Sequence, residues 1–586
     1  MLKFLYALFF MVLFPLGLLA WGHQASLHFT TPLYLPTTWG LVLLGLGGSL
    51  FLWSMAILML YGQGLPMNAF PPPRFVTQGP YRLFSHPIYV GFCLMVYGTA
   101  LFYRSRAGFF LVAPTTALST VALVWGYEGI DLAARFTTLR AVPFVGLVPQ
   151  AQSTPQLVDK GRAVLHLGLL GLFLIALLLG ATRPPLASIQ LVFLGVSLLG
   201  LGSSLLRQQQ FTSVIRSSYQ IAVLLVLNTL LWLITEQVAW PALGGLLIGM
   251  WCKAKRLRNG LLMAAVLLGI WGGWPLTSLV GNGVLFLLAF YIDAIARYFR
   301  CITEQTANSW YAWQMGPVRL INHGLYAGVA TCLGAQLTFA LSGGRFLQAM
   351  VLLISFAFLF AALWGQSVEG SERLKRPLGY FGFVLGAVAS VPVLSLWNND
   401  LWYLAASVAV SGLFGQGLGR LRCLVNGCCH GRLTAPHLGI KVKHAQSRVT
   451  KISQLNRQPI HATQVYSLGG LCLSGGVLLY LWGQEVSFSL LVGLYFILSG
   501  LVRFVEEAYR GEVQTKIIGG MRIYQWLALL SVGIGVVLTC LTSEATPGWQ
   551  PCLQWQQLVV SMCLGLLAVF LMGVDFPASK QRFSRL

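Results

Sequence analysis

The sequence predicts an all-α membrane protein, a polytopic transmembrane helical bundle with about 16–18 spans arranged in three blocks. Of its 586 residues, 56% are apolar and only 9% are charged, whereas soluble domains carry about 25% charged residues. A membrane-spanning helix needs about 20 mostly apolar residues. Apolar runs that approach this length recur from one end of the chain to the other. Representative runs are Phe4–Trp21, Trp39–Leu60, Ala163–Ala181, Ala349–Trp364 and Leu558–Val574.

Two polar stretches divide the apolar runs into blocks. Phe144–Lys160 is rich in proline, glutamine and serine, as is typical of a linker, and Glu304–Met315 is a second break. The predicted domains are therefore residues 1–150, a middle membrane block at residues 161–317 and a C-terminal block at residues 318–575. The middle block contains no motif from which we infer a chemistry.

The formal net charge is +23. A basic chain can bind nucleic acid, but here the Lys and Arg residues lie in short loops between apolar runs, where membrane topology accounts for them. We therefore expect no nucleic-acid partner. The positive-inside rule places the most basic loops, and both chain termini, on the cytoplasmic side. These loops are Lys253–Arg258, Arg373–Arg376, Arg420–Arg457 and Lys580–Arg585.

The segment Gly79–Gly91 places an arginine, a histidine and two tyrosines at the entrance to an apolar run. Polar groups are costly there unless they are used. Glu128 and Asp131 follow the next hairpin of spans, so they return to the same face of the membrane. These residues could form an interfacial pocket with a carboxylate, aromatic faces for a cation and a histidine for proton transfer. The alternative is a set of interfacial anchors with no ligand.

The order of these residues resembles the Gly-Pro-Tyr-Arg…His-Pro-x-Tyr-x-Gly motif of the isoprenylcysteine carboxyl methyltransferase and phospholipid methyltransferase group. The resemblance covers residues 40–150 and includes a second motif from Glu128 to Val142-Pro143. It implies an S-adenosylmethionine site at the cytoplasmic face. The residues that would line this cofactor site are Tyr81, Arg82, His86, Tyr89 and Glu128.

The stretch Gly419–Arg432 is the most unusual in the chain, because arginines, cysteines, an asparagine and a histidine follow an apolar run. One interpretation is a zinc site formed by thiolates and imidazoles. Its candidate ligands are Cys423, Cys428, Cys429 and His430, with His437, His444 and His461. Adjacent cysteines rarely both ligate, and Cys-x4-Cys-Cys-His is not a recognised ligand spacing. We therefore expect no metal.

A second interpretation of the same stretch is a phosphate site. Arg420, Arg422 and Arg432 could hold a phosphate group by bidentate hydrogen bonds, together with Asn426. The third is a basic loop that touches anionic lipid headgroups without specificity.

Two later polar segments favour the phosphate site. His461–Tyr466 opens one apolar run, and Arg503–Arg510 closes the next. In the second segment Arg503, Glu507 and Arg510 are spaced i, i+4 and i+7, so they share one face of a helix. Such a row of charges can be purely structural. With only 15 acidic residues in the chain, we favour a site.

These segments, in this order, resemble the motifs of the prolipoprotein diacylglyceryl transferases over about residues 318–542. The matching positions are Gly379–Gly386, Gly419-Arg420, Asn426, Gly431-Arg432, His461, Gln464, Tyr466, Arg503-Phe504, Glu507, Arg510 and Gln525. The resemblance implies transfer of a diacylglyceryl group from phosphatidylglycerol to a lipoprotein cysteine, with release of glycerol phosphate. It implies catalysis by Arg420, Arg503, Glu507 and His461, and substrate binding by Asn426, Arg432, Gln464, Tyr466 and Arg510.

Both resemblances have departures. Phe381 stands where the transferases often carry a histidine thought to act as base, and His461 or His430 could take that role. In the N-terminal block, Ser85 replaces the usual arginine and the segment after Phe136 is shortened. The family's arginine loop also faces outward, whereas the charge distribution here places the loop inside.

We therefore expect a multi-pass enzyme of the bacterial cytoplasmic (inner) membrane. One module would transfer a diacylglyceryl group from phosphatidylglycerol, or another anionic phospholipid, to a lipoprotein precursor or a related acceptor. The other would be a methyltransferase-like module that uses S-adenosylmethionine. The alternative is a non-catalytic lipid-binding scaffold or transporter with degenerate enzyme sites.

Overall fold

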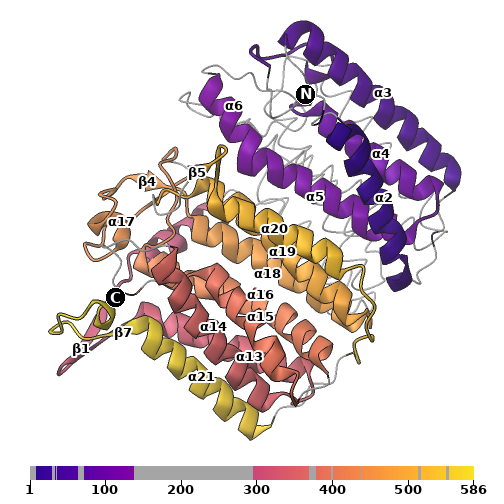
Figure 1. Ribbon diagram of the computed structural model, residues 1–586. Coiled ribbons are helices and arrows are strands. Elements are labelled where there is room, and N and C mark those ends of the chain that lie inside the picture. The colour runs from indigo at the N-terminus through magenta and orange to yellow at the C-terminus, as the bar shows by residue number, and fades with distance from the viewer. Residues whose placement is uncertain are drawn as a thin grey trace, which may run out of the picture. The chain divides into compact units, whose positions relative to one another are not determined.

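The computed structural model contains two compact units, Met1–Tyr298 and Phe299–Leu586. Figure 1 shows helices as the dominant element of both units. The structure describes residues 5, 8–29, 33, 36–63, 72–82, 84–136, 295–368, 376, 378–397, 400–436, 438–512, 517–548 and 554–586.

The N-terminal unit is built from apolar helices interrupted by three π-helical turns. These turns continue into α-helices, so that Phe9–His28 and Gly108–Arg135 each form one helix long enough to cross a membrane. Thr37–Gly62 is a third such helix, and Pro87–Phe102 is shorter. The elements are η1 (Phe9–Leu13), α2 (Phe14–Gln24), η2 (Ala25–His28), α3 (Thr37–Gly62), η3 (Gly79–Arg82), α4 (Pro87–Phe102), η4 (Gly108–Val112), α5 (Ala113–Leu123), η5 (Val124–Glu128) and α6 (Gly129–Arg135).

Helices α3 and α4 pack backbone to backbone. A Cβ atom added to Gly47 would lie 2.8 Å from the carbonyl oxygen of Gly91, and one added to Gly91 would lie 2.8 Å from that of Gly47. Any side chain at either position would force the helices apart. Small residues at helix contacts are the usual solution in a lipid environment, where close van der Waals packing must hold helices together. The contact fixes α4, whose first residues carry the Gly79–Gly91 motif.

The C-terminal unit is a bundle of eight long helices with short strands at one end (Figure 1). Six of these helices are long and apolar enough to cross a membrane, whereas α15 and α20 are shorter apolar helices. The helices are α13 (His323–Leu341), α14 (Leu347–Ser367), α15 (Tyr380–Leu394), α16 (Leu401–Asn426), α17 (Arg448–Lys451), α18 (Thr463–Gly483), α19 (Phe488–Tyr509), α20 (Ile523–Leu538) and α21 (Trp555–Gly573), followed by η6 (Arg582–Ser584).

Small antiparallel sheets close the strand-bearing end of this bundle. They are β1 (Ala312–Met315), β2 (Val318–Ile321) and β7 (Val574–Asp575) in the order β1-β2-β7, β3 (Ile440–Lys441) with β4 (Pro459–Ile460), and β5 (Ile517–Ile518) with β6 (Met521–Arg522). Arg319 of β2 forms two hydrogen bonds of 2.8 and 2.6 Å with the buried carboxylate of Asp575. The start and the end of the bundle are thereby joined.

The core of the bundle is aromatic and aliphatic. Trp482 is fully buried beside Tyr403 and Phe488, and its indole N–H donates to the carbonyl of Gly548 at 3.0 Å. A buried indole requires such a partner, since an unsatisfied donor costs about 1–3 kcal/mol. This cluster holds α16, α18 and α19 together, and these three helices position the site described below.

The predicted fold class, a polytopic helical membrane protein, is confirmed. The predicted runs Trp39–Leu60, Ala349–Trp364 and Leu558–Val574 correspond to α3, α14 and α21 within a few residues. Within the described ranges there are nine candidate spans and three shorter apolar helices. The structure also contains short strands, which the apolar pattern of the sequence did not predict. Ala163–Ala181 and the middle block lie outside the described residues, so the total number of spans and the domain limits stay predictions.

Basic residues gather at the strand-bearing end of the C-terminal bundle. Because the eight long helices run alternately up and down, the described segments 309–322, 427–436, 438–462, 510–512, 517–522 and 574–586 all lie at this end. The opposite end is formed by the described segments 342–346, 395–397, 484–487 and 539–548 with residues 400 and 554, where Arg345 is the only Lys or Arg among the described residues. It pairs at 3.7 Å with Asp400 across that end. This asymmetry agrees with the expectation that the basic loops share one side of the membrane.

We predict that the strand-bearing end faces the cytoplasm. Lys443→Cys, at an exposed position of this end, should resist a membrane-impermeant thiol reagent in intact cells and react after permeabilisation. Glu544→Cys, exposed at the opposite end, should react in intact cells. Both are compared with the unsubstituted chain to subtract native cysteines. Labelling of Lys443→Cys in intact cells, with Glu544→Cys protected, would show the reverse orientation.

Candidate functional site

Three arginines and two glutamates meet at the strand-bearing end of the C-terminal bundle. Arg420 near the end of α16 donates to Glu506 Oε2 of α19 at 2.8 Å. Arg503, one turn earlier on α19, donates to the same oxygen at 2.9 Å and lies 3.1 Å from Glu507 Oε2. Arg510 donates to Glu507 Oε2 at 2.9 Å and lies 3.6 Å from Glu506 Oε1. The two carboxylates thus bridge all three guanidinium groups.

The cluster is buried and carries surplus positive charge. Both glutamate side chains are 1% exposed, and that of Arg503 is 5% exposed. Three guanidinium groups face two carboxylates, and Glu512 also interacts electrostatically with Arg510. Arg422 and Arg448 line the same cavity, so positive charge is in surplus there. The Nε atoms of Arg503 and Arg510 are buried with no hydrogen-bond partner among the described residues. Buried polar groups are normally paired, so this surplus charge and these unpaired donors together suit an anion.

Aromatic rings enclose Arg503 on its other sides. Its Cζ atom lies 5.5 Å from the centroid of the Tyr380 ring, 5.3 Å from that of Tyr524 and 5.9 Å from that of Phe381. Cation–π contacts of this kind stabilise a desolvated guanidinium by about 1–2 kcal/mol. Phe381, which stands where a histidine base was expected, therefore packs on the Arg503 guanidinium. Its ring stacks on that of Tyr524, with 5.2 Å between the ring centroids.

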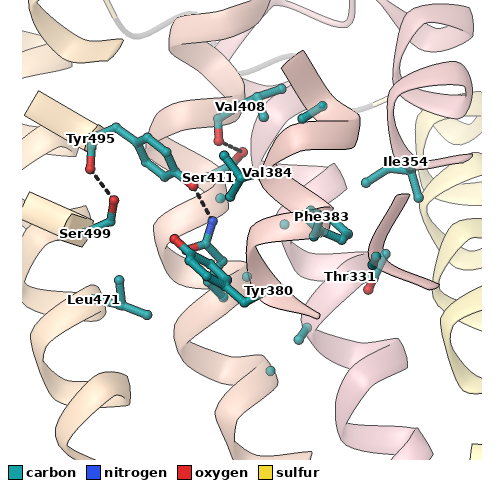
Figure 2. A pocket seen from close by; sticks show the side chains of 18 of the residues that line it. Thr331, Ile354, Tyr380, Phe383, Val384, Val408, Ser411, Leu471, Tyr495 and Ser499 are labelled. Carbon is teal, nitrogen blue, oxygen red and sulfur yellow. Dashed lines mark hydrogen bonds between the residues drawn. The ribbon is translucent and has the colours of Figure 1, made fainter. Parts of the chain in front are cut away.

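A cavity of about 690 Å³ extends from this cluster into the bundle. Arg420, Arg503 and Arg510 line one end of it. Its remaining wall is mainly apolar and comes from α13, α14, α15, α16, α18 and α19. Figure 2 shows Ile354, Phe383, Val384 and Leu471 among the side chains that line it. The lining follows α15 from Gly379 to Leu394, which corresponds to about 22 Å at 1.5 Å per residue.

A few polar groups interrupt the apolar wall. Gln416 of α16 donates through Nε2 to the phenol oxygen of Tyr495 on α19, and Ser499 donates to the backbone carbonyl of Tyr495 at 2.6 Å (Figure 2). The Oε1 atom of Gln416 is buried and has no hydrogen-bond partner in the part of the chain that the structure describes. Tyr380, whose ring also contacts Arg503, lies beside this group in the view of Figure 2. The cavity therefore offers isolated hydrogen-bonding groups between its charged end and its apolar remainder.

The segment after α16 is a tight turn held by backbone hydrogen bonds. Gly427 ends the helix with φ 75° and Cys429 follows with φ 58°, a left-handed conformation that non-glycine residues rarely adopt. The backbone N–H of Cys429 donates to Glu512 Oε2 at 2.9 Å. Gln464 donates to the carbonyl of Cys428 at 2.8 Å, and Thr463 donates to that of Cys429 at 2.6 Å. Gln464 thus fixes this turn and is absent from the lining of the cavity.

His461, Tyr466 and Arg432 form a separate group outside the cavity. Nδ1 of His461 lies 3.0 Å from the phenol oxygen of Tyr466, and the guanidinium of Arg432 lies 5.2 Å from the centroid of the Tyr509 ring. Burial, with a smaller effect of Arg432, lowers the pKa of His461 to about 4. Its imidazole is therefore neutral near pH 7. Asn426 is buried at the C-terminus of α16.

The residues considered as zinc ligands are only partly brought together. The Sγ atoms of Cys423, Cys428 and Cys429 all lie within 4.8 Å of one another. His430 lies outside that group, and its Nδ1–H donates to the carbonyl of Gly427 at 3.0 Å. His444 accepts a hydrogen bond from the backbone N–H of Gln446. His437 lies outside the described residues.

Glu506 is the residue that sequence reasoning missed. It is the shared partner of Arg420, Arg503 and Arg510, yet the i, i+4, i+7 spacing directed attention to Glu507. A signal was available, because two adjacent acids near the end of an apolar helix are unusual in a chain with so few acids. Glu507 adds a second carboxylate for Arg503 and Arg510, whereas Glu506 contacts all three guanidinium groups.

The N-terminal unit contains a second polar cluster, between α4 and the end of the helix that contains η5. Nδ1–H of His86 donates to Glu128 Oε1 at 3.1 Å, and the Tyr89 hydroxyl donates to Glu128 Oε2 at 2.6 Å. Glu128 is the last residue of the π-helical turn η5, an element often found at functional sites. The expected return of Glu128 to the same face as His86 is confirmed. Asp131 instead pairs with Arg135 at 2.6 Å.

The residues present here fit a small polar cofactor. His86 is 6% exposed, and its Nε2 is buried with no hydrogen-bond partner among the described residues. Tyr81, five residues before His86 in the same motif, is also buried. Burial raises the pKa of its phenol, which therefore stays neutral. The Arg82 side chain and Val142-Pro143 lie outside the described part of the chain. The described donor set is thus a carboxylate, an imidazole and two phenols.

Fold and sites together define a polytopic helical membrane protein with a buried arginine–glutamate cluster at the end of an apolar cavity. Residues 277–541 match the family model described as prolipoprotein diacylglyceryl transferase, and residues 35–129 match the one described as phospholipid methyltransferase. The two-part resemblance is confirmed by these matches. The first match begins about 40 residues before the resemblance inferred from the motifs.

Curated relatives of the C-terminal half are similar over part of their length. A phosphatidylglycerol–prolipoprotein diacylglyceryl transferase of Clostridium tetani is 26% identical over 157 residues, which are 27% of this chain and 60% of the relative. Those of Erythrobacter litoralis and Verminephrobacter eiseniae are 30% and 31% identical over 184 and 200 residues. These matches cover 29% and 31% of this chain, and 62% and 65% of the relatives. The chain thus spans less than two thirds of the length of these three relatives.

We predict that Glu506 is the most important charge for the stability of this unit. Glu506→Gln removes the negative charge that faces three buried guanidinium groups, and breaking a buried ion pair costs about 3–5 kcal/mol. Unfolding of the purified protein in detergent should show this loss as a lower free energy of unfolding. Glu485→Gln, at an exposed position of the same unit, should change it by less than about 0.5 kcal/mol. Equal stabilities of the two variants would contradict the shared-carboxylate geometry.

Proposed function

We propose that the C-terminal unit transfers a diacylglyceryl group from phosphatidylglycerol to a lipoprotein cysteine or a related acceptor. The observation that carries the proposal is the Arg420–Arg503–Arg510 cluster at the end of an apolar cavity. A phospholipid needs this combination, a charged headgroup joined to long apolar chains. The names of the family and of the relatives supply the class of reaction.

The arginine cluster suits the phosphodiester of the lipid. Guanidinium groups bind phosphate oxygens through two parallel N–H donors. Arg503 retains an Nε donor without a hydrogen-bond partner among the described residues, Arg510 Nε has only a 3.6 Å contact with Glu506, and arginines outnumber carboxylates at this end of the cavity. In a low-dielectric site such an interaction is stronger than in water. An anionic lipid is therefore favoured over a zwitterionic one.

The cavity suits the acyl chains. Its lining follows α15 for about 22 Å, which exceeds the about 15 Å depth of one leaflet of the bilayer core. Its volume of about 690 Å³ lies within the usual range of ligand sites, about 300–1,000 Å³. Gln416 and Tyr495 lie between the charged and apolar parts, where the ester groups of a bound lipid would be.

The reaction has a simple balance. The acceptor sulfur forms a bond to the glyceryl carbon next to the phosphate oxygen, and the C–O bond to that oxygen breaks. The thiol proton passes to a base, and glycerol phosphate leaves with one more negative charge than the phosphodiester had. Arg420 and Arg503 would stabilise the charge that develops on the leaving oxygen, which is the largest effect that preorganised donors provide.

The other predicted site residues would hold the arginines and the adjacent turn in place. Glu507 holds Arg503 and Arg510, and Gln464 holds the turn at Cys428. We assign His461, Tyr466, Arg432 and Asn426 to the support of this turn. The backbone of His461 contacts Gly431, where an added Cβ atom would lie 2.4 Å from His461 Cβ. His461 is absent from the cavity lining, so we propose that it positions the loop.

For the N-terminal unit we propose a methyltransferase-like module that binds S-adenosylmethionine. When bound, this cofactor supplies a methyl group on a sulfonium sulfur. Glu128, held by His86 and Tyr89, would accept hydrogen bonds from its amino or hydroxyl groups. Tyr81 and Tyr89 would present aromatic faces to the cation, and Arg82 remains a candidate from the motif. We place the protein in the bacterial inner membrane, with a lipoprotein precursor as candidate partner.

We predict that Arg503→Lys lowers transfer from phosphatidylglycerol by about 100-fold, since a lysine cannot replace two parallel donors. The assay uses purified protein, labelled phosphatidylglycerol and a cysteine-containing lipoprotein peptide. Arg345→Lys, at the exposed pair on the opposite end of the bundle, should retain full activity. Phospholipid binding without any transfer by the unsubstituted protein would favour the lipid-binding scaffold or transporter instead.

We predict that Glu128→Gln weakens S-adenosylmethionine binding about tenfold, because a charged acceptor contributes about 1.5–3 kcal/mol per hydrogen bond. Calorimetric titration of the full-length protein in detergent measures this change. The control is Asp131→Asn, which alters a nearby carboxylate whose partner is Arg135. If both variants bind the cofactor like the unsubstituted protein, the His86–Glu128–Tyr89 cluster is not its site.

A further inference from the structure

Three thiols converge at the charged end of the cavity. The Sγ atoms of Cys423, Cys428 and Cys429 all lie within 4.8 Å of one another, and all three residues line the cavity. No disulfide is present among these three residues. Free cysteines usually pack singly as small apolar groups, so three facing thiols beside arginines require an explanation.

The backbone explains how two adjacent cysteines can both face Cys423. Successive side chains of an extended chain point in opposite directions, so adjacent cysteines need a special backbone conformation to face one partner. Here Cys429 has φ 58°, directly after the left-handed Gly427 turn. Hydrogen bonds from Gln464 and Thr463, and to Glu512, fix this conformation. Two of these hydrogen bonds, with Thr463 and Glu512, are made by Cys429 itself, and the one from Gln464 is made to the preceding Cys428. A left-handed non-glycine residue held in this way is a costly arrangement that tends to occur at functional sites.

We propose that Cys423, Cys428 and Cys429 bind one Zn²⁺ ion as thiolates and leave its fourth coordination position open to the cavity. Zn–S bonds of about 2.3 Å place tetrahedral thiolate sulfurs about 3.8 Å apart, so the observed separations need little closure. Thiolates are the ligands that select zinc and other soft or borderline cations. Three protein ligands and one open position are typical of catalytic zinc sites.

The charges around the thiols suit this ion. Binding releases three thiol protons, and a Zn²⁺ ion with three thiolates carries one net negative charge. Arg420 and Arg510 both interact electrostatically with Cys429, so the complex is formed beside positive charge. Arg422 and Arg448 also line this end of the cavity. A positive surplus therefore remains there for a phosphate.

The open position would accept the sulfur of the acceptor, an extension that rests on the proposed function. The acceptor thiol loses its proton to water or to Glu512, which lines the same end of the cavity, and its sulfur binds the metal as a thiolate. Among the described residues no histidine lines the cavity, and Phe381 occupies the position where a base was considered. Binding to the metal would favour the thiolate form of the acceptor, a role that an imidazole base otherwise takes.

The test measures metal binding by the purified full-length protein. After removal of bound metal with a chelator, the protein is titrated with Co²⁺, whose thiolate charge-transfer bands report sulfur ligation, and then with Zn²⁺. We expect one ion per chain and affinities at least about 100-fold weaker in Cys423→Ser, Cys428→Ser and Cys429→Ser, above the loss typical of outer-shell changes. Cys472→Ser, a partly buried cysteine on α18, is the matched control.

Thermal unfolding of each variant without metal shows whether the fold is retained. Absence of stoichiometric binding by the unsubstituted protein, or undiminished binding by all three variants, would overturn the site. A cysteine-containing lipoprotein peptide should shift the Co²⁺ spectrum, and its serine analogue should not. Equal spectra with both peptides would overturn the open position. Failure of lipid transfer alone, with metal and peptide bound, would instead contradict the proposed function.

Discussion

The C-terminal unit depends on one carboxylate. Glu506 is 1% exposed and contacts Arg420 of α16, Arg503 of its own helix and Arg510 beyond that helix. A buried guanidinium without a partner would cost several kcal/mol, so these contacts force α16 and the end of α19 to stay together. Arg510 also forms a β-bridge with Gly431. The same carboxylate therefore helps to fix the turn that carries Cys428 and Cys429 next to Cys423 on α16.

The position of this network defines what the cavity can bind. A charge cluster buried among apolar helices keeps its field strong, because little water screens it. One end of the cavity is thereby polarised, while the wall toward Leu394 and Leu401 remains apolar. An amphiphile with an anionic head satisfies both regions at once. Neither a fully apolar molecule nor a small soluble anion would do so.

The helical fold and most of the site arginines could be predicted from the sequence. The contacts between helices and the thiol cluster could not, for physical reasons. Apolar length predicts α3 and α14, and ordered motifs identify Arg420 and Arg503. The row of charges read from the sequence included Glu507 and not Glu506, although Glu506 is also spaced i+3 from Arg503 and i−4 from Arg510. Its contact with Arg420 lies between two helices, and residue spacing cannot predict it. The thiol group depends on the left-handed backbone of Cys429, which residue spacing does not encode. His461 was predicted to catalyse, and only tertiary packing shows that its ring faces Tyr466 and Tyr509.

Both units bury a carboxylate near a helix end, but the charged groups around that carboxylate differ. In both, a carboxylate near a helix end is held by hydrogen bonds and lies beside aromatic rings. In the C-terminal unit guanidinium groups outnumber carboxylates, so the site favours an anion. In the N-terminal unit the cluster has one carboxylate, Glu128, held by one imidazole and one phenol. On the proposed function, this carboxylate would favour a cation, such as a sulfonium or an amine. On the proposed function, a single chain would provide sites for an anionic lipid and a cationic cofactor, and the charged groups of each cluster would distinguish them.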